Sequence, residues 1–184
     1  MIQGKQVYQS EKVAVKSEDI SGIEKYLETH NLGNRGIEDG DSRKQLVGLL
    51  GENIIVEKLT GQKIDFETKT DGFDGGFDLT YKEKRIDVKT MERSSYVRGE
   101  FVNNFYTMQE GYKADIIVFC SYNKKEQVLE ICGWIYKSEL STRGIFYKKG
   151  TVRTRADKTT FTFRQDNYEV ENKNLRPFKE LLSL

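Results

Sequence analysis

The 184-residue sequence has few of the residues that build linkers, zinc sites and histidine-dependent active sites. Its single proline leaves no Pro-rich linker, so we expect one globular unit. Two cysteines without a CxxC pair and a single histidine are too few ligands for a structural zinc site, and they argue against a histidine-dependent triad. We expect Cys120 and Cys132 to be reduced and buried, and His30 to lie at the surface.

Long apolar stretches and an excess of one charge are also lacking. No run approaches the roughly 20 apolar residues that span a bilayer, and the N-terminus has no apolar stretch of signal-peptide type, so we expect a cytoplasmic protein without membrane contact. Lys and Arg number 30 and Asp and Glu number 29, which gives a net charge of +1. This balance excludes histone-like binding through a uniform positive field, although opposite charges can still be segregated in space.

The hydrophobic pattern predicts an α/β (α+β) fold with a mixed sheet flanked by helices. Two helices are expected near the N-terminus, at 17–30 and 43–59, and the second is ended by Gly61. A short helix is expected at 101–111 and another at 175–184, with Pro177 in its first turn. Residues 7–15 are expected to form a short strand or an irregular arm. The other expected strands are 63–66, 77–81, 85–91, 114–122, 127–136, 151–155, 159–164 and 168–170. Residues 1–34 are expected to form an accessory arm or helix, and residues 35–184 the main domain.

Two acidic residues and a lysine are expected to share one face of a hairpin. Asp87 and Lys89 are two positions apart in a strand, so their side chains point the same way. A turn at 83–84 would place Asp78 opposite Lys89 and Leu79 opposite Val88, and it would gather the apolar side chains on the other face. Carboxylates of this kind suit Mg²⁺, and the ammonium of Lys89 can stabilise charge on a phosphate. A cross-strand ion pair on a solvated face is the simpler alternative.

Two neighbouring features favour the catalytic interpretation. The segment 71–78 is dense in glycine, which lets the backbone approach a ligand closely, and it ends on Asp78 at the start of a strand. Glu52 lies in a helix that is apolar on nearly all sides, so its carboxylate needs a cation or a hydrogen-bond partner. A metal or a lysine would supply that partner, as would the backbone or an arginine such as Arg35.

These motifs together resemble the PD-(D/E)XK nuclease superfamily, which has the restriction-endonuclease-like fold. The resemblance covers about residues 35–140 and depends on the order and spacing of short motifs. The matching positions are Glu52 on a helix, Asp78 at the start of a strand, Asp87-Val88-Lys89 on the next strand, and two later strand segments at 114–119 and 133–140.

The sequence departs from the family pattern in two places. Phe77 stands where the name-giving proline would be, which is a common variation. Asp71 and Asp74 compete with Asp78 for the role of the first acid, and we prefer Asp78 because it is the one placed on the strand.

The resemblance implies a DNA endonuclease that depends on Mg²⁺, with Mn²⁺ able to substitute. It implies that Asp78, Asp87 and the Val88 carbonyl bind the metal, and that Glu52 binds it directly or through water. Lys89 would orient or activate the attacking water. Restriction, recombination or repair in a phage or mobile element would suit such an enzyme, and a homodimer would let it cut both strands. The main alternative is a non-catalytic DNA-binding or assembly protein on the same fold.

The cations expected to contact DNA are concentrated toward the C-terminus. Residues 137–164 carry eight Lys and Arg against two acids, with Phe and Tyr interleaved. Positive charge beside aromatic rings suits a phosphate backbone and unstacked bases. The candidate DNA contacts are Arg93, Arg98, Lys148, Lys149, Arg153 and Arg155.

Overall fold

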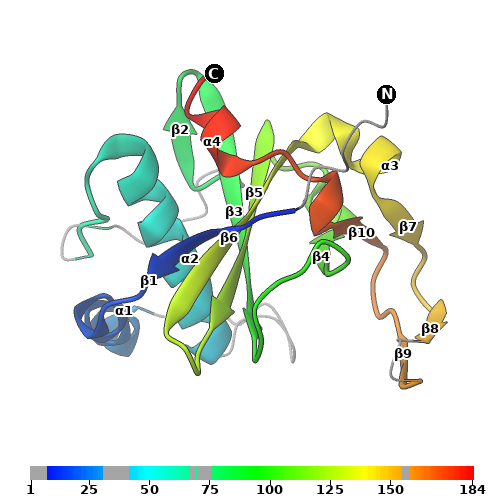
Figure 1. Cartoon of the computed structure of the whole chain (residues 1–184), viewed down its shortest axis with the longest axis horizontal. Helices are drawn as coiled ribbons and strands as arrows, with labels where there is room; N and C mark the ends of the chain where they lie inside the picture. Colours follow the sequence, from blue (N-terminus) through cyan, green and yellow to red (C-terminus); the bar gives the residue numbers. More distant parts are fainter. Residues whose placement is uncertain (1–7, 31–41, 67–68, 70–75, 155–157) are drawn as a thin grey trace, which may run out of the picture.

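A computed structural model of the chain describes residues 8–30, 42–66, 69, 76–154 and 158–184 (Figure 1). Within these residues, helices and strands alternate irregularly and three short 3₁₀ helices join them. The elements are β1 (Glu11–Ala14), α1 (Ser17–Thr29), α2 (Ser42–Thr60), β2 (Leu79–Tyr81), β3 (Lys84–Arg93), β4 (Val102–Tyr106), η1 (Thr107–Gln109), β5 (Ile116–Asn123), β6 (Val128–Tyr136), η2 (Lys137–Glu139), α3 (Leu140–Arg143), β7 (Ile145–Tyr147), β8 (Val152–Thr154), β9 (Thr160–Thr162), β10 (Asn167–Glu171), η3 (Asn172–Asn174) and α4 (Phe178–Leu181).

The architecture is mixed α+β, built on a five-stranded sheet of order β1-β6-β5-β3-β2. Strand β3 runs parallel to β5, whereas the other neighbours are antiparallel. The class expected from the sequence, α+β with a mixed sheet, is therefore confirmed, although helices α1 and α2 cover only one face of that sheet. None of the described helices is long and apolar enough to cross a membrane.

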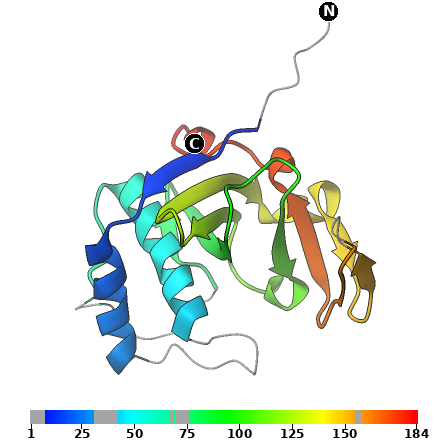
Figure 2. The same ribbon diagram turned by 60° about the horizontal axis from the view of Figure 1, so that its bottom comes forward.

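Helices α1 and α2 cover one face of this sheet (Figure 2). The apolar side chains of α2 pack on Ile86 and Val88 of β3 and on alternate residues of β5, and α1 packs against α2 as well. These two contacts explain why α2 is apolar on nearly all sides. Gly51 allows the close approach, because a Cβ there would lie 1.8 Å from Thr90 Oγ1. The helix ends at Gly61, whose φ of 77° is readily adopted by glycine.

A smaller sheet of order β4-β10-β7 packs on the opposite face of the central sheet. Its residues Phe105 and Val170 meet Ile117, Phe119 and Ile135, so the odd-numbered residues of β5 face this layer. The β8–β9 hairpin continues beyond β7, at the end of the molecule opposite α1 (Figure 1). The central sheet is thus buried on both faces. Polar side chains can therefore gather where a strand of this sheet has no neighbouring strand on one side.

The described part of the N-terminal segment belongs to the main core. Strand β1 pairs with β6, and α1 buries Ile23 and Tyr26 against α2. His30 is partly exposed at the end of α1 and stacks on Tyr26. Cys120 and Cys132 are free and buried, as expected.

Three predicted elements are corrected by the structure. The segment 101–111 is not a helix: its first half is β4, which pairs with β10, so a long-range pairing outweighs the local pattern. The residues at 63–66 form no strand. The last helix is only one turn, α4, and Pro177 precedes it as the N-cap rather than lying inside its first turn.

Candidate functional site

The β2–β3 hairpin turns at Lys82 and Glu83, which differs from the predicted turn. Both residues have positive φ, 44° and 64°, and a two-residue turn of this kind matches the twist of the strands. Leu79 therefore pairs with Ile86, and the predicted pairing of Leu79 with Val88 is wrong by two residues. Because the shift is even, the apolar face stays the same. Neither turn residue is a glycine or asparagine, so the sequence did not mark this turn.

Strand β2 is much shorter than β3, so it pairs only with the first part of β3. The pairing ends at Ile86, whose carbonyl accepts a hydrogen bond from the Asp78 backbone N–H at 2.8 Å. Within the described chain, no strand pairs with this side of β3 from Asp87 onward. We call this segment of β3, Asp87 to Arg93, the open edge.

Asp78 caps the start of the open edge. Its Oδ2 accepts a hydrogen bond from the Val88 N–H at 2.6 Å, in the place where a neighbouring strand would accept one. Asp78 consequently lies beside Asp87 instead of opposite Lys89. Burial raises the pKa of Asp78 well above its usual value, and the negative charges of Glu52 and Asp87 raise it further. The bond from Val88 and the charge of Lys89 oppose this rise without cancelling it.

Asp87 and Lys89 share one face of β3, as their spacing predicted. Lys89 Nζ lies 2.9 Å from Asp87 Oδ2, and the Asp87 side chain is 8% exposed against 28% for Lys89. The carboxylate is therefore held inside the protein while the ammonium reaches toward solvent. Such a pair can present one cation to an incoming anion while keeping an acid beside it.

Glu52 reaches the same region from α2, on the other face of the sheet. Its carboxylate is partly buried, and Lys69 Nζ lies 3.9 Å from Glu52 Oε2. Its charge acts on Asp78, as the raised pKa of that residue shows. The sequence required a cationic or hydrogen-bonding partner for Glu52, and the structure supplies Lys69. Arg35, the alternative partner, lies outside the described residues.

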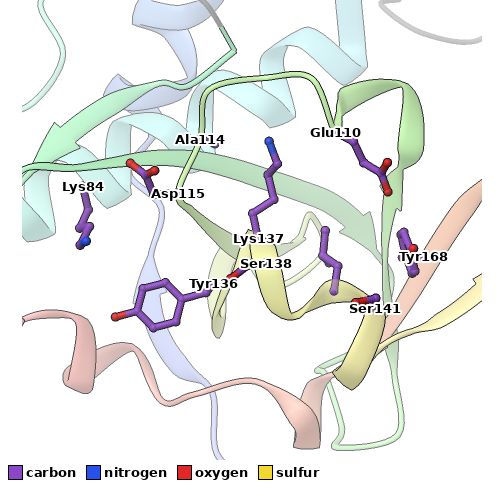
Figure 3. Close-up of a pocket in the computed structure, with 10 residues that line it drawn as sticks. Lys84, Glu110, Ala114, Asp115, Tyr136, Lys137, Ser138, Ser141 and Tyr168 are labelled. Carbon is purple, nitrogen blue, oxygen red and sulfur yellow. The ribbon is translucent and has the colours of Figure 1, made fainter.

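Lys137 approaches from the far side of β5, at the start of η2. Its ammonium donates to the Tyr112 carbonyl, and it lines a cavity of about 580 Å³ together with Lys84, Glu110 and Asp115 (Figure 3). Burial lowers the pKa of Lys137, and the charge of Asp87 is the strongest influence that opposes this lowering. Lys137 therefore lies close enough to Asp87 to feel its charge.

A second cavity, of about 610 Å³, opens beside Lys89. It crosses the open edge of β3, between the beginning of α2 on one face and β4 with η1 on the other. We call it the Lys89 groove. Its lining residues are Arg43, Lys44, Val47, Lys89, Thr90, Met91, Glu92, Asn103, Asn104, Tyr106, Gln109 and Phe119.

The acids at the open edge have the chemistry of a magnesium site but not a closed cage. In the part of the chain that the structure describes, no three His, Cys, Asp or Glu residues are grouped so that they could hold a metal ion. Mg²⁺ is commonly bound by one or two carboxylates and keeps several waters for substrate phosphates. Asp78 and Asp87 fit that requirement, because their crowded negative charge would be neutralised by a hard cation.

Three of the predicted DNA contacts are exposed. Arg98 has a side chain that is 72% exposed and lies 3.9 Å from Glu100. Lys148 and Lys149 are exposed in the turn between β7 and β8. These cations are available to a phosphate backbone.

The other predicted DNA contacts differ in their surroundings. Arg93 is partly buried and donates to the Val102 carbonyl at 2.5 Å, and burial lowers its pKa. Arg153 pairs with Glu169, which is buried. Arg155 lies outside the described residues. Arg93 and Arg153 thus have internal partners that a phosphate would have to replace.

Sequence reasoning missed two lysines, Lys69 and Lys137, as neighbours of the acids. Lys69 belongs to no motif, and nothing in the spacing joins it to Glu52. Lys137 was counted only within the basic C-terminal region, although it directly follows the strand β6 that borders β5. The competing acids Asp71 and Asp74 lie outside the described residues.

Comparison of the chain with protein-family models, with curated proteins and with solved structures finds no match. The interpretation of the site therefore depends on its own residues and their geometry.

Proposed function

We propose that the chain is a Mg²⁺-dependent DNA endonuclease with a restriction-endonuclease-like fold. The observation that carries the proposal is that Glu52 and Asp87 both act electrostatically on Asp78, beside the ion pair of Asp87 with Lys89 at the open edge of β3. Glu52 comes from a helix, Asp78 from the start of a hairpin, and Asp87 with Lys89 from the next strand. This is the order in which the resembling family presents its acids and lysine.

The position of the acids supports hydrolysis rather than a structural role. Burial is the main cause that raises the pKa of Asp78, and the negative charges of Glu52 and Asp87 add to it. A carboxylate whose ionisation is disfavoured in this way gains most from a divalent cation. Asp78 and Asp87 would hold the ion, with the Val88 carbonyl and Glu52 completing its shell directly or through water.

The remaining residues supply orientation and positive charge. Bound Mg²⁺ would stabilise charge on the phosphate and acidify a bound water. Asp78 is fixed by the hydrogen bond from Val88, so its second oxygen is left for the cation. Lys89, held 2.9 Å from Asp87, orients the attacking water or the phosphate. Lys137 adds a second ammonium near Asp87.

Plasmid cleavage by the purified full chain tests this function. Supercoiled DNA should be nicked or cut with Mg²⁺ or Mn²⁺ and remain intact in EDTA. Asp87→Asn and Lys89→Ala should each slow cleavage by about 10²–10³-fold, because each removes a group acting on the reacting phosphate. Lys84→Ala is the matched control, since Lys84 is an exposed lysine on the same strand.

Two results would overturn the proposal. One is cleavage by Asp87→Asn and Lys89→Ala at the wild-type rate. The other is DNA binding without cleavage, combined with no Mg²⁺ binding by calorimetry, which would favour the non-catalytic DNA-binding alternative.

A further inference from the structure

The Lys89 groove has positive charge at one end. Arg43 and Lys44, at the start of α2, and Lys89 face a single acid among the lining residues, Glu92. That acid is paired with Arg43 at 2.5 Å. Lys89 is likewise paired with Asp87, so the three cations exceed these two acids by one. This end of the groove therefore suits an anion near the open edge, where the proposed reaction takes place.

The rest of the groove has a different chemistry. Val47, Met91 and Phe119 contribute apolar surface, and Tyr106 contributes an aromatic ring that is 39% exposed. Three neutral amides, Asn103, Asn104 and Gln109, also line it. Phosphates need cations and N–H donors, and they gain nothing from an aromatic ring beside apolar walls.

The asparagine amides of the groove are held in place before any ligand arrives. Asn103 Nδ2 donates to the Val170 carbonyl and to Asn172 Oδ1, at 3.2 and 2.7 Å. Asn104 Oδ1 accepts from Asn167 Nδ2 at 2.9 Å, which leaves the Asn104 amide nitrogen as the donor for a ligand. Fixed amides of this kind read the hydrogen-bonding edge of a nucleobase.

A nucleobase has both features that the groove complements. Its flat face packs on aromatic and apolar side chains, and its edge pairs with amides. In a duplex that face is covered by neighbouring bases, so a base can enter a concave site only when it is unpaired or extruded. A groove of about 610 Å³ has the volume of a small-molecule site.

We infer that the Lys89 groove binds the base of an unpaired nucleotide, and that the chain acts on single-stranded or branched DNA. The inference rests on the proposed nuclease function, because Lys89 belongs both to the groove and to the Asp87 ion pair. A base in the groove would place the phosphate of its own or the adjoining nucleotide at the open edge. Tyr106 stacks on the base, Asn104 and Gln109 pair with its edge, and Arg43 and Lys44 contact the backbone.

DNA binding by the full chain tests this inference separately from cleavage. A fluorescein-labelled oligonucleotide is presented as a single strand, as a blunt duplex and as a duplex with a single-stranded flap, with Ca²⁺ in place of Mg²⁺. Fluorescence anisotropy should show the single strand and the flap binding about tenfold tighter than the duplex. A 2-aminopurine at the unpaired position should change its fluorescence when the base enters the groove.

Gln109→Ala and Asn104→Ala should each remove most of that preference while leaving duplex affinity unchanged. Gln109→Ala is the safer variant, because Asn104 also bonds Asn167 in the fold. Met108→Ala is the matched control: Met108 precedes Gln109, is 63% exposed and does not line the groove.

The two proposals fail in different ways. Equal binding of single strand and duplex, or an equal weakening of both by Gln109→Ala, would overturn the base-binding inference even if Mg²⁺-dependent cleavage is seen. A single-strand preference that depends on Gln109, in a protein that cuts no DNA, would support base binding and overturn the nuclease.

Discussion

The open edge of β3 and the cluster around Glu139 contain the same kinds of side chains in opposite balance. At the open edge, Asp78 lies among further acids, Asp87 and Glu52, and the pKa of Asp78 is raised by burial and by their charges. In the Glu139 cluster, formed by Glu139, Arg143 and Arg176, the cations are in excess.

Both carboxylate oxygens of Glu139 have cationic partners. Arg176 bonds its two oxygens at 2.5 and 2.7 Å, and Arg143 lies 3.5 Å away. The hydrogen bonds from Arg176 lower the pKa of Glu139. The guanidinium of Arg176 also packs over the rings of Trp134 and Tyr136. A carboxylate held like Glu139 strengthens the fold, whereas one crowded like Asp78 weakens it until a cation arrives.

Because Glu139 is paired whereas Asp78 is crowded, we expect the largest loss of stability when Glu139 is replaced. Glu139→Ala should lower the free energy of unfolding by about 1–2 kcal/mol, because it breaks a bidentate, partly buried pair and the bond to the Tyr136 N–H. Urea unfolding measures the change. Glu126→Ala, in the exposed turn between β5 and β6, is the matched control. An equal effect of the two substitutions would remove the distinction between the clusters.

The local pattern of the sequence was enough to predict the elements that build the core. Alternation along β3, β5 and β6 and the apolar helices at α1 and α2 correspond to the observed burial. The pattern failed at β4, whose conformation depends on pairing with β10, more than sixty residues further along the chain. Secondary structure that is fixed by a distant partner leaves little trace in the local sequence.

The candidate site was predictable only where its residues are close in sequence. The spacing of Asp87 and Lys89 was sufficient to place them on one face. The register that sets Asp78 beside Asp87 depended on Lys82 and Glu83 adopting positive φ, which their side chains do not favour. The contact of Lys69 with Glu52 depends on tertiary packing, and no spacing could show it.

A second test replaces one of the crowded acids. Asp78→Asn should leave the fold as stable as the wild type or raise its free energy of unfolding by up to about 1 kcal/mol, because it removes a buried carboxylate that Glu52 and Asp87 repel. The asparagine oxygen can still accept from the Val88 N–H, so the capping bond is kept. Urea unfolding without divalent ions measures the effect.

Addition of Mg²⁺ extends the same test. A bound ion stabilises the folded state by mass action, so Mg²⁺ should raise the stability of the wild type more than that of Asp78→Asn. A loss of stability in Asp78→Asn similar to that of Glu139→Ala would instead make Asp78 a structural residue. No response of the wild type to Mg²⁺ would argue against a metal at the open edge.

The smaller of the two ion-pair losses is expected at Asp115, which resembles Glu139 in having an arginine partner but is more exposed. Hydrogen bonds from the side chain and backbone of Arg85 lower the pKa of Asp115 to about 2, from an ordinary value of 3.8. A carboxyl whose pKa is lower in the folded state stabilises the fold above its ordinary pKa, and that contribution disappears as the pH falls through about 2.

Asp115→Asn should therefore lower the free energy of unfolding less than Glu139→Ala does at neutral pH, because solvent screens the pair of Asp115 with Arg85. Unfolding measured from neutral to acid pH should show the difference between Asp115→Asn and wild type shrinking between about pH 4 and pH 2. A difference that stays constant over this range would mean that the ionised carboxylate of Asp115 contributes nothing, and that only Asp78 and Glu139 distinguish crowded from satisfied acids in this fold.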